Sequence, residues 1–330
     1  MNSDPQASAR GSGNLLLRVL SALVLVPVVL VCVWLGAPWF AAMLAVVALA
    51  AGAEWRAITV TETAGLRMLS IMVPLFVLVV GEVASPAAGM IALIVGLALT
   101  AGTFAAPWGE RSWALTAHLH LGLAVIAMLF VRAQPETGLD LIVFLFAVVW
   151  MSDIGGYAAG RLIGGPRLAP RVSPNKTWAG AVGAILFSLA TAAVLARAVG
   201  VAAEPALAIA ALLSVATQTG DLFESWLKRR FGVKDSGTLI PGHGGVLDRI
   251  DGLLFAAPVL AVIVRCSERS SRHGAERNQG AVACAPHLDP RRDRVHRQQH
   301  GGPHPAQPRP LRRCGRHGAP QRGGACGVGA

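Results

Sequence analysis

Long runs of apolar residues recur along the first 265 residues and are separated by short polar segments. The nine runs are 16–35, 38–54, 68–83, 86–105, 113–131, 139–160, 178–199, 203–220 and 252–265. A helix needs about 20 residues to cross the hydrocarbon core of a bilayer. Backbone groups in lipid must bond internally, and the runs lack the alternation of outer-membrane barrel strands. The pattern therefore predicts an all-α polytopic integral membrane protein with about nine transmembrane helices.

The positions of Lys and Arg between these runs predict the orientation of the helices. If the N-terminus is cytoplasmic, the inner connections hold Arg161, the basic cluster at 228–234 and most other cations, whereas the outer ones hold little beyond Arg132. Short cytoplasmic loops are enriched in Lys and Arg. We therefore expect a cytoplasmic N-terminus, with residues 1–14 as a disordered polar segment. The first run is too long for a signal peptide and is expected to stay as an anchor.

Composition agrees with a membrane protein and divides the chain into two parts. Hydrophobic residues make up 54% and charged residues 14% of the 330 residues, whereas a soluble domain carries about 25% charged residues. The net charge of +11 would suggest a nucleic-acid partner, but residues 266–330 alone hold 12 Arg, no Lys and 4 acidic residues. We therefore expect no nucleic-acid partner and a membrane domain over residues 15–265.

Residues 266–330 lack the features of a folded domain. They are rich in Arg, Gly and Pro, hold four of the five cysteines and contain no Phe, Trp, Tyr, Ile or Met. Without apolar periodicity there is no core to fold around, so this tail is predicted to be disordered. Arg without Lys is also typical of GC-rich DNA read in the wrong frame, and we hypothesise a frameshift near residue 265. A basic arm that binds anionic lipid and a Cys/His metal site are the alternatives.

Two polar segments on the predicted cytoplasmic side hold the candidate functional residues. In the first segment, Asp153 lies within an apolar run, several glycines follow it, and Lys176 precedes the next run. An acidic side chain within a membrane span is costly and is usually functional. The alternative is a packing role in which Asp153 pairs with Arg161. The glycines could serve only to let two helices approach closely.

The second segment, residues 220–251, combines carboxylates, cations and glycines. Two sets of polar residues recur with helical spacing: Asp221, Glu224, Ser225 and Lys228, and then Asp248 and Asp251. Carboxylate oxygens together with substrate phosphates suit Mg²⁺, and Lys and Arg suit a polyphosphate. Glycines between the two sets let backbone N–H groups approach phosphate oxygens. These residues predict a site at the cytoplasmic membrane boundary that joins a water-soluble phosphate compound to a lipid.

Two other interpretations account for part of this segment. A juxtamembrane loop that binds anionic lipid heads explains Lys228 and its neighbouring arginines but not the aspartates, which anionic lipid would repel. An ion-coupled transporter with intramembrane carboxylates explains Asp153 and Asp221 but not the loop of Gly, His and Lys.

Residues 225–251 read S-W-L-K-R-R-F-G-V-K-D-S-G-T-L-I-P-G-H-G-G-V-L-D-R-I-D. This stretch closely resembles the signature of the phosphatidate cytidylyltransferases, also called CDP-diacylglycerol synthases. Asp153 with its following glycines and residues 173–178 resemble upstream motifs of the family, although Ala179 stands where an acidic residue is often found. The resemblance covers roughly residues 15–264.

The resemblance implies an Mg²⁺-dependent nucleotidyl transfer of phospholipid biosynthesis, in which CTP and phosphatidate give CDP-diacylglycerol and pyrophosphate. The implied metal ligands are Asp221, Asp248 and Asp251. The implied catalytic residues are Asp221, Asp248, Lys228 and His243. The implied substrate-binding residues are Arg229, Lys234, Asp235, Ser225, Gly244 and Gly245, with Lys176 and Arg161 as second choices.

The same resemblance sets the expected partners and location. CTP, phosphatidic acid and the lipid bilayer are the expected partners, and the expected location is the cytoplasmic (inner) membrane of a bacterium. A homodimer is compatible with the sequence, and a monovalent cation beside Mg²⁺ is left open.

Overall fold

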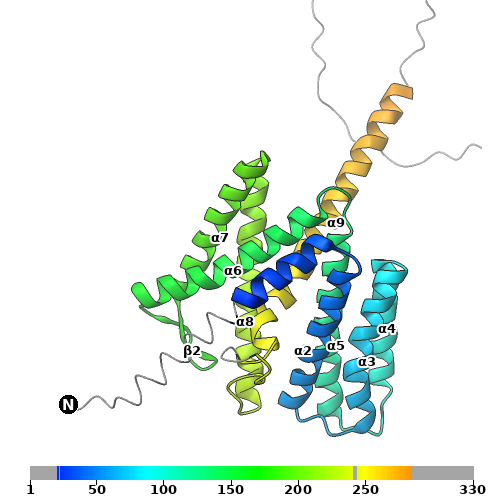
Figure 1. Ribbon diagram of the computed structural model, residues 1–330, viewed down its shortest axis with the longest axis vertical. Coiled ribbons are helices and arrows are strands. Elements are labelled where there is room, and N and C mark those ends of the chain that lie inside the picture. Colours follow the sequence, from blue (N-terminus) through cyan, green and yellow to red (C-terminus); the bar gives the residue numbers. More distant parts are fainter. Residues whose placement is uncertain (1–20, 22, 241–243, 284–330) are drawn as a thin grey trace, which may run out of the picture. The chain divides into compact units, whose positions relative to one another are not determined.

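The computed structural model describes residues 21, 23–240 and 244–283, with side chains up to residue 273. Within these residues the chain is almost entirely helical (Figure 1). A short helix, Leu23–Leu35, comes first. The longer helices are α2 (Trp39–Ile58), α3 (Ala64–Val83), α4 (Pro86–Ala101), α5 (Trp108–Arg132), α6 (Gly138–Leu162), α7 (Trp178–Val199), α8 (Ala203–Arg230) and α9 (Leu247–Ala283). An antiparallel pair of strands, β1 (Arg167–Ala169) and β2 (Ser173–Thr177), joins α6 to α7.

Seven of the described helices are long and apolar enough to span a bilayer: α2, α3, α5, α6, α7, α8 and α9 up to His273. Large apolar side chains are exposed on their surfaces and on the shorter α4, among them Ile91, Ile94, Val182 and Val194. A water-soluble surface rarely carries so many, whereas lipid-facing helices require them. The chain is therefore a polytopic integral membrane protein, as predicted. Each predicted run overlaps one helix, and the number of nine spans stays a prediction.

The last helix extends past the boundary predicted at residue 265. α9 is continuous from Leu247 to Ala283, so residues 266–283 are helical where the sequence predicted disorder. A helix propagates at little cost once it is nucleated, even through polar residues. Residues 274–330 form a separate unit, of which the structure describes only the helical part up to residue 283. The predicted disordered segment 1–14 lies outside the described residues.

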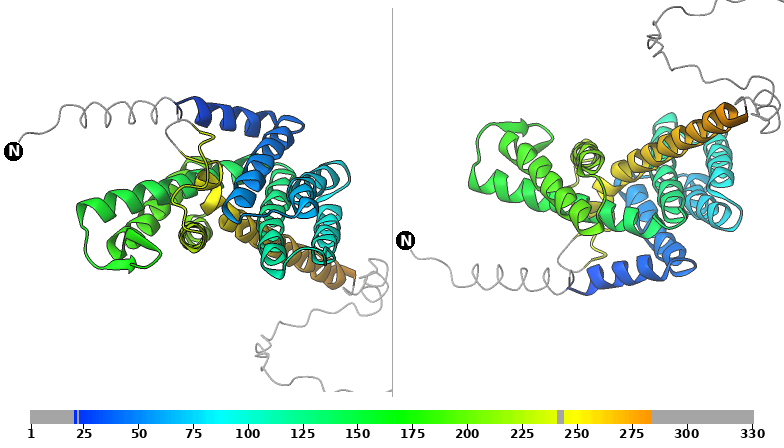
Figure 2. Two further views of the ribbon diagram at one scale, coloured as in Figure 1. Left: turned by 90° about the horizontal axis from the view of Figure 1, so that it is seen from below. Right: turned by 90° about the horizontal axis from the view of Figure 1, so that it is seen from above.

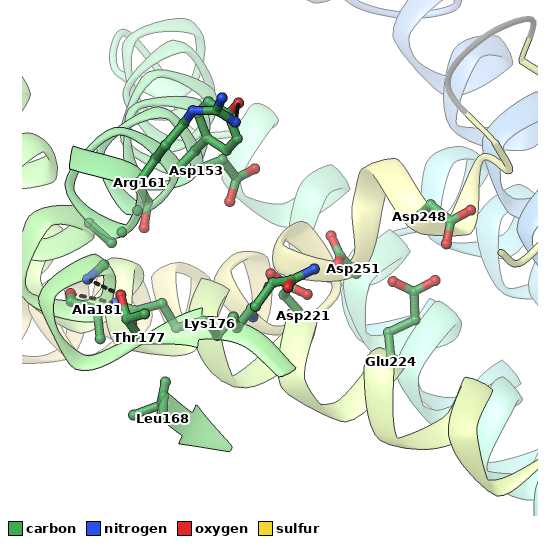
Figure 3. A pocket seen from close by; sticks show the side chains of 18 of the residues that line it. Asp153, Arg161, Leu168, Lys176, Thr177, Ala181, Asp221, Glu224, Asp248 and Asp251 are labelled. Atoms are coloured by element: carbon green, nitrogen blue, oxygen red, sulfur yellow. Dashed lines mark hydrogen bonds and ion pairs between the residues drawn. The ribbon is translucent and has the colours of Figure 1, made fainter. Parts of the chain in front are cut away.

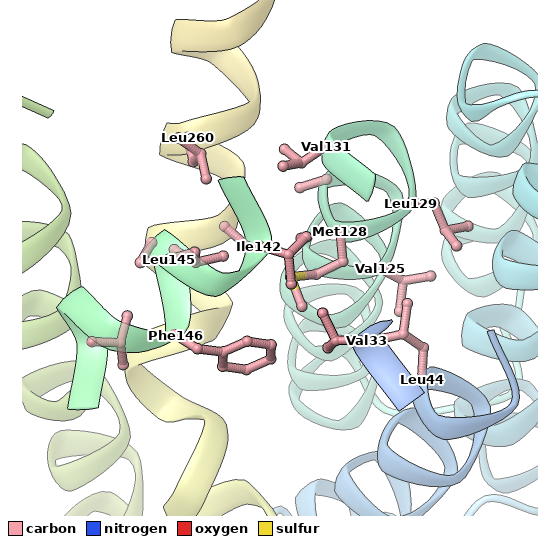
Figure 4. Close-up of a cluster of buried hydrophobic side chains, with 14 of the residues drawn as sticks. Val33, Leu44, Val125, Met128, Leu129, Val131, Ile142, Leu145, Phe146 and Leu260 are labelled. Carbon is pink, nitrogen blue, oxygen red and sulfur yellow. The ribbon is translucent and has the colours of Figure 1, made fainter. Parts of the chain in front are cut away.

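The helices of the first unit pack in two groups, with α9 contacting both. α2–α5 pack on one another, as do α6–α8 (Figure 2). The largest apolar cluster includes Val33, Ile142, Leu145 and Leu260, all fully buried (Figure 4). In lipid such a cluster stabilises the fold by close packing rather than by removing apolar surface from water. A second cluster brings Leu247, at the start of α9, against α2 and α5.

Small residues bring α6 and α7 into close contact. A Cβ atom at Gly183 would lie 2.8 Å from the carbonyl oxygen of Gly155, and a Cβ at Gly155 would lie 2.7 Å from the carbonyl oxygen of Gly183. The predicted packing role of the glycines is confirmed at this contact. Thr177 caps α7, since its Oγ1 accepts a hydrogen bond from Gly180 N at 3.0 Å. The cap places Lys176 directly before the helix.

We expect Gly183→Val to destabilise the protein by about 1–3 kcal/mol, because the added atoms would overlap α6. Gly109→Val is the matched control, since a Cβ there meets nothing within 4 Å. Thermal unfolding of the purified chains in detergent would measure the effect. Equal midpoint temperatures of unfolding for the two variants would contradict the importance of the contact between α6 and α7.

Candidate active site

A polar cavity of about 950 Å³ lies where α6, β2, α8 and the first turn of α9 meet (Figure 3). Its acidic lining residues are Asp153, Asp221, Glu224, Asp235, Asp248 and Asp251, and its basic lining residues are Arg161, Lys176, Lys228 and Arg249. The lining therefore holds more acidic than basic side chains, by six to four.

Lys228 connects α8 to the start of α9 through two carboxylates. Its Nζ donates to Asp248 Oδ1 at 2.6 Å and lies 3.5 Å from Glu224 Oε1, one helical turn earlier. Glu224 is only 4% exposed. A buried carboxylate is tolerated only when a cation or hydrogen-bond donors compensate for its lost hydration. Lys228 meets this requirement for Asp248, whereas Glu224 Oε1 accepts no hydrogen bond among the described residues and has only the longer ion pair with Lys228.

The Asp248 carboxylate is also held by backbone groups of the preceding loop. Its Oδ2 accepts hydrogen bonds from Gly245 N at 2.9 Å and from Ser236 N at 3.0 Å. N–H groups before and within the first turn of a helix lack intrahelical partners, so an acidic side chain there is favourable. Three different groups therefore fix the direction of this side chain.

A second lysine–carboxylate pair lies nearer to α7. Lys176 Nζ is 2.5 Å from Asp221 Oδ2, and Ser225 Oγ donates to Asp221 Oδ1 at 3.4 Å. Asp251 is close enough to both Asp221 and Glu224 to interact electrostatically with them. Two carboxylates so close share a hydrogen bond, as Asp251 and Glu224 do, so this end of the cavity gathers three acidic side chains from α8 and α9.

Most of the residues predicted from the sequence line this cavity: Asp221, Asp248, Asp251, Lys228, Lys176, Arg161, Asp235 and Gly244. Ser225 and Gly245 lie behind the lining and bond to Asp221 and Asp248. Arg229 and Lys234 are exposed and do not line the cavity. Each helical residue is rotated by about 100° from the last, so Lys228 and Arg229 face different directions. His243 lies outside the described residues.

Asp153 faces the cavity and does not pair with Arg161 as the packing alternative required. Arg161 Nη1 donates instead to the Tyr157 hydroxyl at 3.3 Å. The charges that act on Asp153 belong to Asp221, Lys176 and Arg249. Asp153, which lies within an apolar run, is therefore one of the residues that line the polar cavity.

Glu54 was not predicted as a site residue, and Glu224 was placed in the second polar segment without a role of its own. The two side chains are only 5% and 4% exposed. Glu224 shares the helix face of Asp221 and Lys228, and that spacing was a usable signal. Glu54 is the last residue of an apolar run. A carboxylate there is costly unless a cation or hydrogen-bond donors compensate for it, so the sequence implies that Glu54 has such a partner. That partner lies about 190 positions further along the chain, so the run itself could not identify it.

Residues 16–267 match the sequence profile of the cytidylyltransferase family. The chain belongs to this family. The phosphatidate cytidylyltransferase of Brucella suis biovar 1 (strain 1330) is 41% identical over 255 residues, which cover 75% of this chain and 92% of the relative. The Staphylococcus saprophyticus protein of the same name is 44% identical over 141 residues, or 42% of this chain and 54% of the relative. The predicted resemblance is confirmed, and it favours an enzyme over an ion-coupled transporter.

The cavity of this cytidylyltransferase-family protein offers oxygen donors to a cation. Among the described residues, no three His, Cys, Asp or Glu side chains are grouped as a ready-made metal site. Mg²⁺ takes only one or two carboxylates when substrate phosphates supply further oxygens. α8 and α9 contribute such carboxylates to a single cavity. The chemistry of the donor set therefore fits Mg²⁺.

Proposed function

We propose that this membrane protein transfers the cytidylyl group of CTP to phosphatidate, giving CDP-diacylglycerol and pyrophosphate. The observation that supports this activity most directly is that acidic and basic residues from α6, β2, α8 and α9 line one cavity. Family membership and the names of the relatives support the same activity. A phosphate oxygen of phosphatidate bonds to the α-phosphorus of CTP. The bond from that phosphorus to the bridging oxygen breaks, and pyrophosphate leaves with the electron pair.

The carboxylates are proposed to hold Mg²⁺ and the lysines to hold phosphate. Asp221 and Asp248 would bind the ion, with Asp251 as a third carboxylate. Bound Mg²⁺ neutralises charge on the phosphates and orients them. Lys176 and Lys228, now paired with the carboxylates, would turn to phosphate oxygens when both substrates are present. Positioning and charge neutralisation then carry the reaction.

The remaining predicted substrate ligands fall into two groups. Arg161, Asp235 and Gly244 line the cavity and are proposed to contact the substrates there. Arg229 and Lys234 lie outside the lining, so a role in substrate binding would require contact with a part of the substrate beyond the cavity.

An apolar groove of about 430 Å³ adjoins the polar cavity and supports a lipid substrate. The groove is lined by the Leu23–Leu35 helix, α2, α5, α6 and α9, and it shares Asp153, Asp248 and Arg249 with the polar cavity. Its volume lies within the range of ligand pockets. An amphiphile can therefore place its phosphate in the cavity and an acyl chain in the groove. We assign the groove to an acyl chain of phosphatidate.

We expect Ala50→Trp to raise the KM for long-chain phosphatidate about tenfold, because Ala50 lines the groove and an indole would occupy the space of the chain. The KM for CTP should not change, and dihexanoyl phosphatidate should be nearly unaffected. Ala98→Trp is the matched control, since Ala98 is exposed on α4 and away from the groove. Equal effects on long and short chains would argue against this assignment.

We infer the orientation of the protein in the membrane from the Lys and Arg residues of its loops and from the position of the polar cavity. The segments 161–177 and 231–246 contribute to the same cavity and must therefore lie on one side of the bilayer. The first segment holds Arg161, Arg167, Arg171 and Lys176, and the second holds Lys234 and directly follows the cations at 228–230. This charge supports a cytoplasmic location, where CTP is present. We propose a cytoplasmic N-terminus, nine spans and a location in the bacterial inner membrane.

Single cysteines in an otherwise cysteine-free chain would test this orientation. Arg167→Cys and Thr238→Cys should resist a membrane-impermeant thiol reagent in intact cells and react in inverted vesicles. Thr137→Cys, in the connection from α5 to α6, should show the opposite pattern. All three positions are exposed. Labelling of Arg167→Cys from outside the cell would refute the orientation and the assigned access to CTP.

We expect Asp248→Asn to lower turnover by on the order of a hundredfold or more, because the loss of charge beside Mg²⁺ removes several kcal/mol of stabilisation. The Asn carbonyl can still accept from Gly245 N, so the variant should fold. CTP-dependent release of pyrophosphate, with and without phosphatidate, measures the activity. Asp140→Asn, exposed at the start of α6, is the matched control. Near-normal turnover of a folded Asp248→Asn variant at limiting Mg²⁺ would exclude the metal assignment.

A further inference from the structure

Glu54 is a buried carboxylate that binds the loop before α9. It lies near the cytoplasmic end of α2 and is 5% exposed. Its Oε1 accepts a hydrogen bond from Val246 N at 2.9 Å, and its Oε2 accepts one from Leu247 N at 2.8 Å. N–H groups at the start of a helix are usually satisfied by a side chain nearby in the sequence or by water. Here a different transmembrane helix supplies the acceptor.

The loop is shaped to admit this carboxylate. A Cβ atom at Gly237 would lie 2.7 Å from Glu54 Oε1, and a Cβ at Gly245 would lie 2.5 Å from Glu54 Oε2. Real Cβ atoms do not approach oxygen so closely, so any larger residue at either position would displace the carboxylate. The two glycines therefore enclose Glu54 from both sides of the loop.

Ser236 connects Glu54 to Asp248. Its Oγ donates to Glu54 Oε2 at 3.3 Å and accepts from Asp248 N at 3.3 Å. Its backbone N–H donates to the Asp248 carboxylate at 3.0 Å. Of the groups that orient Asp248, the Ser236 N–H thus belongs to a residue that Glu54 binds directly, and the Gly245 N–H belongs to the residue before Val246, which Glu54 also binds. Glu54 itself is absent from the lining of the polar cavity.

We propose that Glu54 is a positioning residue, which fixes Ser236 and residues 245–247 so that Asp248 faces Lys228 and the cavity. The proposal rests on the assigned role of Asp248 in catalysis. A carboxylate suits this task because it accepts several N–H and O–H bonds at once, and bonds to an ionised acceptor are stronger than neutral ones. An amide in its place offers one acceptor oxygen and turns an N–H₂ group towards donors, which leaves buried N–H groups unpaired.

The test compares Glu54→Gln and Glu54→Asp in the full chain, purified in detergent with phosphatidate. We expect Glu54→Gln to lower kcat at least tenfold while the KM for CTP stays within about twofold. Glu54→Asp keeps the charge on a shorter side chain and should give an intermediate kcat. Glu82→Gln is the matched control, because Glu82 is exposed on α3. Size-exclusion chromatography and thermal unfolding would normalise each rate to the folded protein.

The outcomes separate this inference from the proposed function. A folded Glu54→Gln variant with the wild-type kcat, or with an effect on KM alone, overturns the positioning role. A loss of activity that only follows the loss of folded protein overturns it as well. If Glu54→Gln does not fold, Glu54→Asp decides, and a wild-type kcat in that variant refutes the inference. Asp248→Asn is measured in parallel, since normal turnover there would refute the assigned site itself.

Discussion

Acidic side chains among membrane helices are stable only where cations or hydrogen-bond donors reach them, and this requirement organises the site. Asp248 accepts from Lys228 and from two backbone N–H groups, and Asp221 pairs with Lys176. The two lysine pairs join different elements, Lys228 on α8 with Asp248 on α9 and Lys176 on β2 with Asp221 on α8. Removing one partner of the more buried pair, Lys228–Asp248, would leave a charge with less compensation. The pairs therefore link β2, α8 and the start of α9 at the site.

The same pairing keeps the cavity ready for anionic substrates. Lys228 bridges Glu224 and Asp248, and Lys176 pairs with Asp221. In the proposed reaction each lysine would exchange a carboxylate for a phosphate oxygen. Because acids outnumber bases in the lining, that exchange leaves carboxylates in need of a cation. This balance is the physical basis for proposing Mg²⁺ together with CTP, rather than a nucleotide bound by basic residues alone.

Packing between helices places this polar cavity beside lipid. Glycines let α6 approach α7 closely. Thr177 caps α7 and ends β2, so Lys176, the residue before it, lies beside the cavity. On the other side, α2, α5 and α9 leave an apolar groove that shares three residues with the cavity. Polar and apolar binding surfaces thus meet at Asp248, as an amphiphilic substrate and a water-soluble nucleotide would require. Glu54 strengthens this junction, because its hydrogen bonds tie α2 to the start of α9.

The sequence by itself determined the membrane class, the positions of the helices and the family. Apolar runs of about 20 residues can satisfy their backbone only as helices in lipid, and the spacing of Asp221 and Lys228 places both on one helix face. Only the tertiary structure decided which faces meet. It brought Lys176 to Asp221 and Glu54 to the start of α9, and it left Arg229 and Lys234 outside the lining. Local spacing specifies which residues share a face, whereas contacts between residues as far apart as Glu54 and Leu247 depend on how helices pack.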